Sequence, residues 1–81
     1  MREMRELIEE LLARVRRARD EAEADAEQAR TDLVRKASGI AGPDVSLDPD
    51  VIRAAADQWA GAIERLRLLD EEASDLRALL R

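Results

Sequence analysis

Clustered carboxylates are the residues of this chain whose types and spacing come closest to catalytic chemistry. They form one group near the N-terminus and another near the C-terminus: Glu3, Glu6, Glu9 and Glu10, and then Asp70, Glu71, Glu72 and Asp75. Carboxylate oxygens are the ligands that Mg²⁺ and Mn²⁺ prefer, and a bound metal can activate water for hydrolysis. On two facing helices these groups would define one alternative function, a metal-dependent all-α hydrolase.

The second carboxylate group also carries a family resemblance. Its segment Glu71-Glu72-Ala73-Ser74-Asp75 resembles the acidic helices of all-α nucleotide pyrophosphohydrolases of the MazG type, and that resemblance implies Mg²⁺ as the cofactor. The helical positions favour a different interpretation, because Glu71, Glu72 and Asp75 project mostly away from the apolar seam and toward arginines. We therefore expect no metal, no cofactor and no enzymatic activity.

Other kinds of site lack the residues that they need. The chain has no histidine and no cysteine, which removes the commonest general base and the commonest transition-metal ligands. No serine or threonine has a base nearby, and no glycine-rich loop is present to hold phosphate. The net charge of -5, with both signs interspersed, argues against nucleic acid and anionic membranes as partners. We expect no small-molecule substrate either.

Composition also indicates where such a chain occurs. The N-terminal residues lack the apolar core of a signal peptide, and no apolar run has membrane-spanning length, so we expect a cytoplasmic protein. All but one of the 14 basic residues are arginine, the exception being Lys36. Together with abundant alanine, this usage favours a high-GC bacterium or its phage as the source. A de novo design is the alternative, since Ala, Glu, Arg and Leu are strong helix formers.

Two long helices are expected to form a single domain over residues 1–81. Residues 2–37 contain neither Gly nor Pro, and apolar or small side chains recur there every three or four residues, with an average spacing of about 3.67. The second helix is predicted over residues 49–80. Asp48 suits the N-cap and Pro49 the first helical position.

A predicted loop, residues 38–48, joins the two helices. Gly39 suits the left-handed conformation that often follows a helix, and Gly42-Pro43 favours a turn. So short a connection makes the helices antiparallel neighbours, and the predicted fold class is an all-α antiparallel helical hairpin. Its core is predicted to contain Ile8, Leu11, Val15, Ala22, Ala26, Ala29, Leu33, Ile52, Ala55, Trp59, Ala62, Ile63, Leu66, Leu69, Leu76 and Leu80.

Charged residues select a register for this hairpin. Placing residue 37 opposite residue 50 brings basic side chains of the first helix near acidic side chains of the second, Arg17 beside Asp70 for example. The same register places Glu21 and Glu23 near Arg65. The residues that we expect to set the register are Arg14, Arg16, Arg17, Asp70, Glu71, Glu10 and Arg77.

The chain carries more apolar surface than one hairpin can cover. The surplus predicts an association surface formed by Leu7, Leu12, Ala54, Gly61, Leu68 and Leu79. Glycine inside a helix is costly, so Gly61 indicates close approach of another backbone. We expect a homodimer that forms a four-helix bundle, or a larger oligomer, with another helical protein as the alternative partner. The basic residues 13–19 followed by the acidic residues 20–27 favour antiparallel pairing of the first helix with its own copy.

The tripeptide Trp59-Ala60-Gly61 resembles the W-x-G motif of the small helical-hairpin substrates of type VII secretion. That resemblance implies a secreted, dimeric hairpin as a further alternative. In that family the motif lies at the turn between the helices, whereas Trp59 falls about ten residues inside the second predicted helix. The chain also has no tyrosine for the C-terminal export signal of the family.

Overall fold

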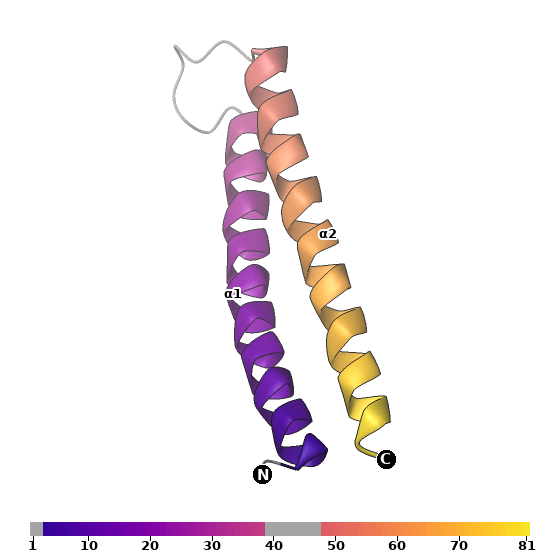
Figure 1. Ribbon diagram of the computed structural model, residues 1–81. Helices are drawn as coiled ribbons and strands as arrows, with labels where there is room; N and C mark the ends of the chain where they lie inside the picture. The colour runs from indigo at the N-terminus through magenta and orange to yellow at the C-terminus, as the bar shows by residue number, and fades with distance from the viewer. Residues whose placement is uncertain (1–2, 39–47) are drawn as a thin grey trace.

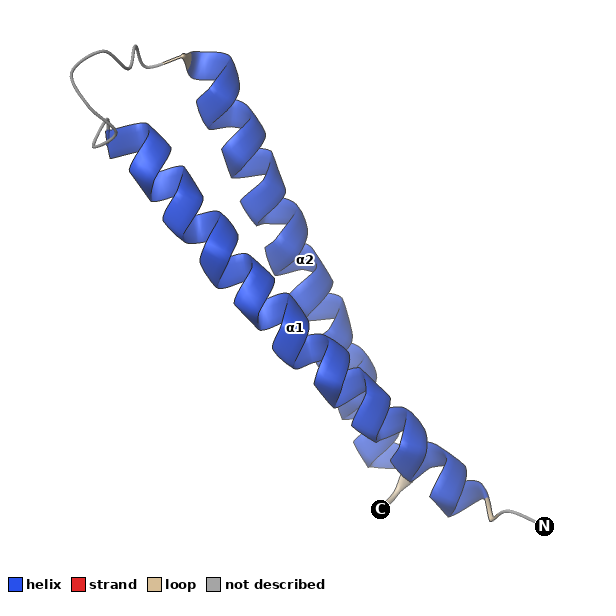
Figure 2. Cartoon of the chain, turned by 90° about the vertical axis from the view of Figure 1, so that its left-hand side faces the viewer, coloured by secondary structure: helices blue, strands red, loops and turns tan. Residues whose placement is uncertain are grey.

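Two long helices lie side by side and antiparallel in the computed structural model, which describes residues 3–38 and 48–81 (Figure 1). Helix α1 spans Met4–Ser38 and helix α2 spans Pro49–Leu79. The chain forms a rod of 64 × 17 × 15 Å, with both termini at one end, which we call the open end (Figure 2). The predicted all-α antiparallel hairpin is therefore confirmed. The predicted turn residues Gly39 and Gly42-Pro43 lie outside the described residues.

Helix α2 begins as its sequence dictates. Asp48 is the N-cap, and its side chain accepts a hydrogen bond from the backbone N–H of Asp50 at 2.9 Å. Pro49 follows at the first helical position, where its missing N–H costs nothing. The carboxylate of Asp50 lies in the first turn, where the helix dipole favours negative charge. These three residues fix the start of α2 locally, before any packing is considered.

The seam of α2 has heptad spacing, and every position in it is buried or half-buried. These positions are Ile52, Ala55, Trp59, Ala62, Leu66, Leu69, Ala73, Leu76 and Leu80. Ile63 was expected in the core, but its side chain is 44% exposed. It follows the seam residue Ala62, and one residue turns a helix by about 100°, so Ile63 points to the side of the hairpin.

The seam of α1 differs from the predicted one by a single step. Leu11, predicted to lie in the core, is 47% exposed, whereas Leu12, predicted to lie on the association surface, is 5% exposed. The seam positions, all buried or half-buried, are Ile8, Leu12, Val15, Arg19, Ala22, Ala26, Ala29 and Leu33, and Ala18 and Asp32 beside the seam are half-buried as well. The seam positions also have heptad spacing, so both helices follow a 3.5-residue repeat rather than two different ones. The predicted stripe missed this repeat because Arg19 occupies one of its positions.

The core between the helices is built mostly from small side chains. Leu12, Val15 and Ala73 form a buried cluster close to the open end, with Leu69, Leu76 and Leu80 packed against it. In the middle of the rod α1 offers only Ala22, Ala26 and Ala29, all buried. Among the described residues, no large side chain is completely shielded from solvent. A two-helix seam of this kind buries less apolar surface than a domain with several layers.

Candidate interaction surface

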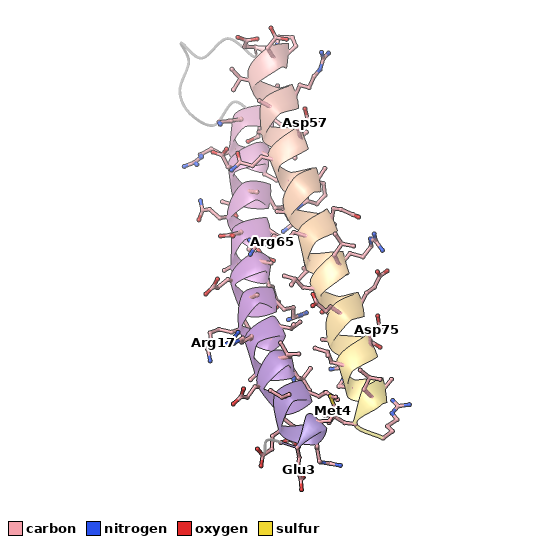
Figure 3. The ribbon with its side chains drawn as sticks, viewed as in Figure 1. Glu3, Met4, Arg17, Asp57, Arg65 and Asp75 are labelled. Carbon is pink, nitrogen blue, oxygen red and sulfur yellow. The ribbon has the colours of Figure 1, made fainter. Side chains whose placement is uncertain are left out.

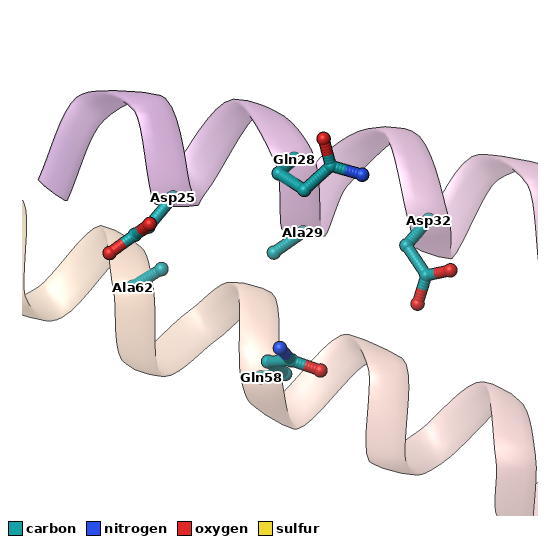
Figure 4. Close-up of a pocket in the computed structure, with 6 residues that line it drawn as sticks. All are labelled: Asp25, Gln28, Ala29, Asp32, Gln58 and Ala62. Carbon is teal, nitrogen blue, oxygen red and sulfur yellow. The ribbon is translucent and has the colours of Figure 1, made fainter. Parts of the chain in front are cut away.

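A polar groove marks one side of the hairpin. It has a volume of about 480 Å³, and its lining consists of four polar residues, Asp25, Gln28, Asp32 and Gln58, with the alanines Ala29 and Ala62 between them (Figure 4). Close to it, Arg65 of α2 forms an ion pair with Asp25 across the helices at 3.7 Å. These contacts show which faces of the two helices meet at this side of the rod.

Helical periodicity extends this side along the whole rod, because residues seven apart on a helix share a face. On α1 this side carries the residues that lie at steps of seven from Asp25 and from Gln28, in both directions along the helix. On α2 it carries the residues that lie at steps of seven from Gln58 and from Gly61. We call this side the Asp25 flank. It consists of Met4, Leu7, Leu11, Arg14, Ala18, Glu21, Asp25, Gln28, Asp32 and Arg35 of α1, and Val51, Ala54, Gln58, Gly61, Arg65, Leu68, Glu72, Asp75 and Leu79 of α2.

Large apolar side chains are concentrated on the Asp25 flank. Six of the eight exposed large hydrophobic residues that the structure describes belong to it, with exposed fractions from 39% to 70%: Met4, Leu7, Leu11, Val51, Leu68 and Leu79. The remaining two, Val34 and Ile63, lie elsewhere. Scattered apolar residues are ordinary on a protein surface, but their concentration on one flank is typical of a binding surface.

Sequence reasoning found this surface only in part. Of the predicted association residues, Leu7, Ala54, Gly61, Leu68 and Leu79 are exposed and belong to the Asp25 flank, whereas Leu12 is buried in the seam. Met4, Leu11 and Val51 were not predicted to belong to it. Met4 and Leu11 lie at steps of seven residues from Asp25, and Val51 lies seven residues before Gln58. This spacing identifies them as members of the flank only after the seam of α1 has been assigned to Leu12 and Arg19.

Gly61 faces open space within the hairpin. A Cβ built on Gly61 meets nothing within 4 Å. The close approach that was predicted for Gly61 is therefore not made by α1. Trp59, two residues earlier, lies in the seam and lines a groove with Ala26, Arg30 and Ile63 on the opposite side. The members of the Trp59-Ala60-Gly61 tripeptide thus do not form one joint surface.

The side opposite to the Asp25 flank, which we call the Arg19 flank, contains a charged cluster. Arg19 Nε donates to Asp70 Oδ1 at 2.7 Å, and Arg19 Nη1 donates to Glu23. The hydrogen bond and the charge of Asp70, followed by the charge of Glu23, raise the pKa of the Arg19 guanidinium above its ordinary value. An arginine in the seam thus keeps its charge paired at the edge of the core.

The ion pairs place the two helices in a slightly different register from the predicted one. Asp70 was expected beside Arg17 and bonds Arg19 instead. Arg65 was expected near Glu21 and Glu23 and pairs with Asp25. Both differences shift α1 by about two residues relative to α2. The predicted register fails because it counted charges along the chain without knowing that Arg19 lies in the seam.

Other predicted register charges have different neighbours. Glu71, which was expected to face a basic residue of α1, pairs within α2 with Arg67, which also binds Glu64. Arg14 is exposed, and it is the next residue, Val15, that joins the buried cluster of Ala73. Pairs of this kind within a helix stabilise it locally and do not select a register.

Acidic side chains are distributed over exposed positions rather than gathered into a ligand set. Lys36 and Arg35 lower the pKa of Asp32 by hydrogen bonds, and Arg67 lowers the pKa of Glu64 in the same way. Glu72 and Asp75 are exposed on α2. Within residues 3–38 and 48–81, no group of three or more acidic side chains is placed to hold a metal ion.

Neither described helix has an apolar stretch long enough to cross a membrane.

Comparisons with known proteins return no relative. No family model matches the chain, and no curated protein and no solved structure matches it.

Proposed function

We propose that this chain acts through protein–protein association, as a non-enzymatic helical hairpin that assembles with further hairpins into a helical bundle. The observation that carries the proposal is the concentration of exposed large apolar side chains on the Asp25 flank. A monomeric hairpin needs only one apolar stripe on each helix. This chain has a second stripe that its own fold leaves in water.

The apolar part of this surface is large enough to matter energetically. Covering the exposed part of one leucine or methionine contributes about 1 kcal/mol. The six exposed residues of each of two copies would then contribute roughly 10 kcal/mol, which is comparable to the cost of bringing two molecules together. Covering the apolar side chains therefore offsets the cost of association only when most of the surface is covered at once.

The modest core of the hairpin supports the same proposal. Five of the eight buried residues that the structure describes are alanine, and chains of this length often depend on oligomerisation for stability. A homodimer with four helices is the simplest closed assembly, because twofold dimers are the commonest homo-oligomers. A different helical protein as the partner is the second candidate, since the same apolar side chains suit it equally well.

Size-exclusion chromatography with light scattering, over a range of concentrations, tests the proposal. We expect a mass of at least twice the 9.1 kDa of the chain. A mass of one chain at the highest concentration reached would overturn self-assembly. Adding Mg²⁺ or Mn²⁺ provides the control for metal chemistry, because a metal-dependent hydrolase would gain thermal stability from its ion and an association module would not.

A further inference from the structure

We propose that the Asp25 flank binds a second copy of this chain with the open ends of both hairpins together, so that α1 of each copy lies beside α2 of the other. This inference rests on the proposed function and adds the binding face, the partner and its orientation. It follows from three features of the flank, which are the position of its leucines, the position of its polar groove and the order of its charges.

The two ends of the Asp25 flank differ in composition, since four of its six large exposed apolar residues lie at the open end, Leu68 lies in the middle and Val51 lies at the far end. At the open end, Met4, Leu7, Leu11 and Leu79 are exposed on neighbouring turns of the two helices. Figure 3 shows Met4 close to that end. At the other end of the flank lies the polar groove of Asp25, Gln28, Asp32 and Gln58 (Figure 4). With the open ends together, the apolar ends of the two flanks cover each other, and the two grooves lie at the same level of the bundle.

Charges along the flank also fit this orientation. Its α1 runs antiparallel to α2 of the partner, which is the relation already present within one hairpin, where Asp25 pairs with Arg65 and Val15 packs on Ala73. The same register applied between the copies brings Arg14 level with the partner's Asp75. It also brings Glu21 level with the partner's Leu68, about one helical turn from the partner's Arg65. Opposite charges thus meet in the middle of the interface, between the apolar open end and the polar groove.

The reverse orientation loses both matches. It would place Leu7 and Leu11 against the polar groove of the other copy, and burying Gln28 or Asp32 under leucine without a hydrogen-bond partner is costly. Antiparallel pairing of α1 with its own copy near residues 19 and 20 has a further disadvantage. It would compete for Arg19, which already bonds Asp70 and Glu23 within the hairpin.

Matched glutamate substitutions test which flank is the interface. Leu68 lies on the Asp25 flank and Ile63 lies on the Arg19 flank, with exposed fractions of 50% and 44% on the same helix. We expect Leu68→Glu to raise the dimer dissociation constant at least tenfold and Ile63→Glu to leave it within about twofold. Sedimentation velocity measures both constants, and circular dichroism checks that helix content is retained.

A second pair on α1 keeps the test decisive if one α2 variant unfolds. Leu11→Glu replaces a residue of the Asp25 flank, and Val34→Glu replaces a residue outside it that is similarly exposed. Dissociation by Leu11→Glu, with Val34→Glu still dimeric, supports the flank. If the control variants dissociate the dimer while the flank variants leave it intact, the proposed binding face is wrong.

Orientation is measured separately with spin labels. The chain has no cysteine, so Glu3→Cys gives a single labelling site at the open end, where Figure 3 places Glu3. With the open ends together, two labels lie within about 35 Å, since the four-helix bundle is roughly two helix diameters wide. In the reverse orientation the labels are separated by about the length of α1, whose 35 residues span roughly 50 Å.

The outcomes separate the two proposals. A short distance by pulsed electron paramagnetic resonance, in a dimer that Leu68→Glu dissociates, supports the whole inference. A dimer with a distance near 50 Å overturns the orientation and leaves the proposed function intact. A monomer at every concentration overturns self-assembly itself, and with it the second copy as the partner.

Discussion

Replacing Leu12 with alanine removes a large buried side chain from the hairpin seam near the open end. Leu12 is 5% exposed, and Val15 and Ala73 form its buried cluster. Leucine-to-alanine changes at such sites cost about 2 to 5 kcal/mol, which combines the lost transfer from water with the cavity left behind. A seam between two helices can partly close over the gap, so we expect a loss of about 2 to 3 kcal/mol for Leu12→Ala.

Leu11 provides the matched control, because it is the adjacent residue and has the same side chain. Its 47% exposure means that about half of its apolar surface is already in water, and its removal leaves no enclosed cavity. We expect Leu11→Ala to reduce the free energy of unfolding of one hairpin by about 1 kcal/mol or less. The two variants should therefore differ by at least about 1 kcal/mol, or roughly 4 to 8 °C in melting temperature for a domain of this size.

Urea titration followed by circular dichroism measures both losses. Leu11 also lies on the Asp25 flank, so Leu11→Ala should weaken association as well as the hairpin. Association contributes more to stability at higher protein concentration, and the difference in unfolding free energy between this variant and the unmodified chain should therefore grow with concentration. Extrapolation to low concentration isolates the hairpin itself. If Leu11→Ala then costs as much as Leu12→Ala, the seam assigned to α1 is wrong and the predicted stripe through Leu11 is right.

Three further predictions address the charges and the glycine. Arg19→Leu should raise the urea midpoint, since it extends the apolar seam; a lower midpoint would mean that the bond to Asp70 outweighs that gain. In the single hairpin at low protein concentration, Gly61→Ala should stabilise α2 by about 0.5 to 1 kcal/mol, because nothing within 4 Å opposes the new methyl group; destabilisation under those conditions would contradict the open space at Gly61. The lowered pKa values of Asp32 and Glu64 contribute stability that is present above their ordinary values of 3.8 and 4.5 and is lost as the pH falls through the lower folded-state values. The urea concentration at the unfolding midpoint should therefore decrease as the pH is lowered below about 4, and the decrease should be smaller in Asp32→Asn. A midpoint that does not change with pH would contradict a stabilising role for these carboxylates.

Local signals made the helices and their ends predictable from the sequence. Asp48 and Pro49 define the start of α2 through backbone geometry alone, and nine apolar or small residues at heptad spacing define its seam. Both signals depend on neighbouring residues only. They are therefore readable without knowledge of the other helix.

The seam of α1 was harder to predict because it is not apolar throughout. Hydrophobic pattern alone directs the stripe around Arg19, through Leu11 and Ala18, whereas heptad packing against α2 requires Leu12 and Arg19. The ion pair with Asp70 makes the arginine tolerable at that position. The interhelical register and the membership of the Asp25 flank depend on this assignment, so the same residue explains both errors.

The position of Arg19 limits how the two rods can align. A regular seven-residue repeat allows one helix to slide along the other by a whole repeat while apolar side chains still meet. Sliding α1 by one repeat in one direction would bring the guanidinium of Arg19 to Arg77, and in the other direction to Ile63. The first alignment sets two cations together and the second offers no acceptor, whereas Asp70 offers a carboxylate. One charged side chain thus discriminates among alignments that the apolar residues alone would leave nearly equal in energy.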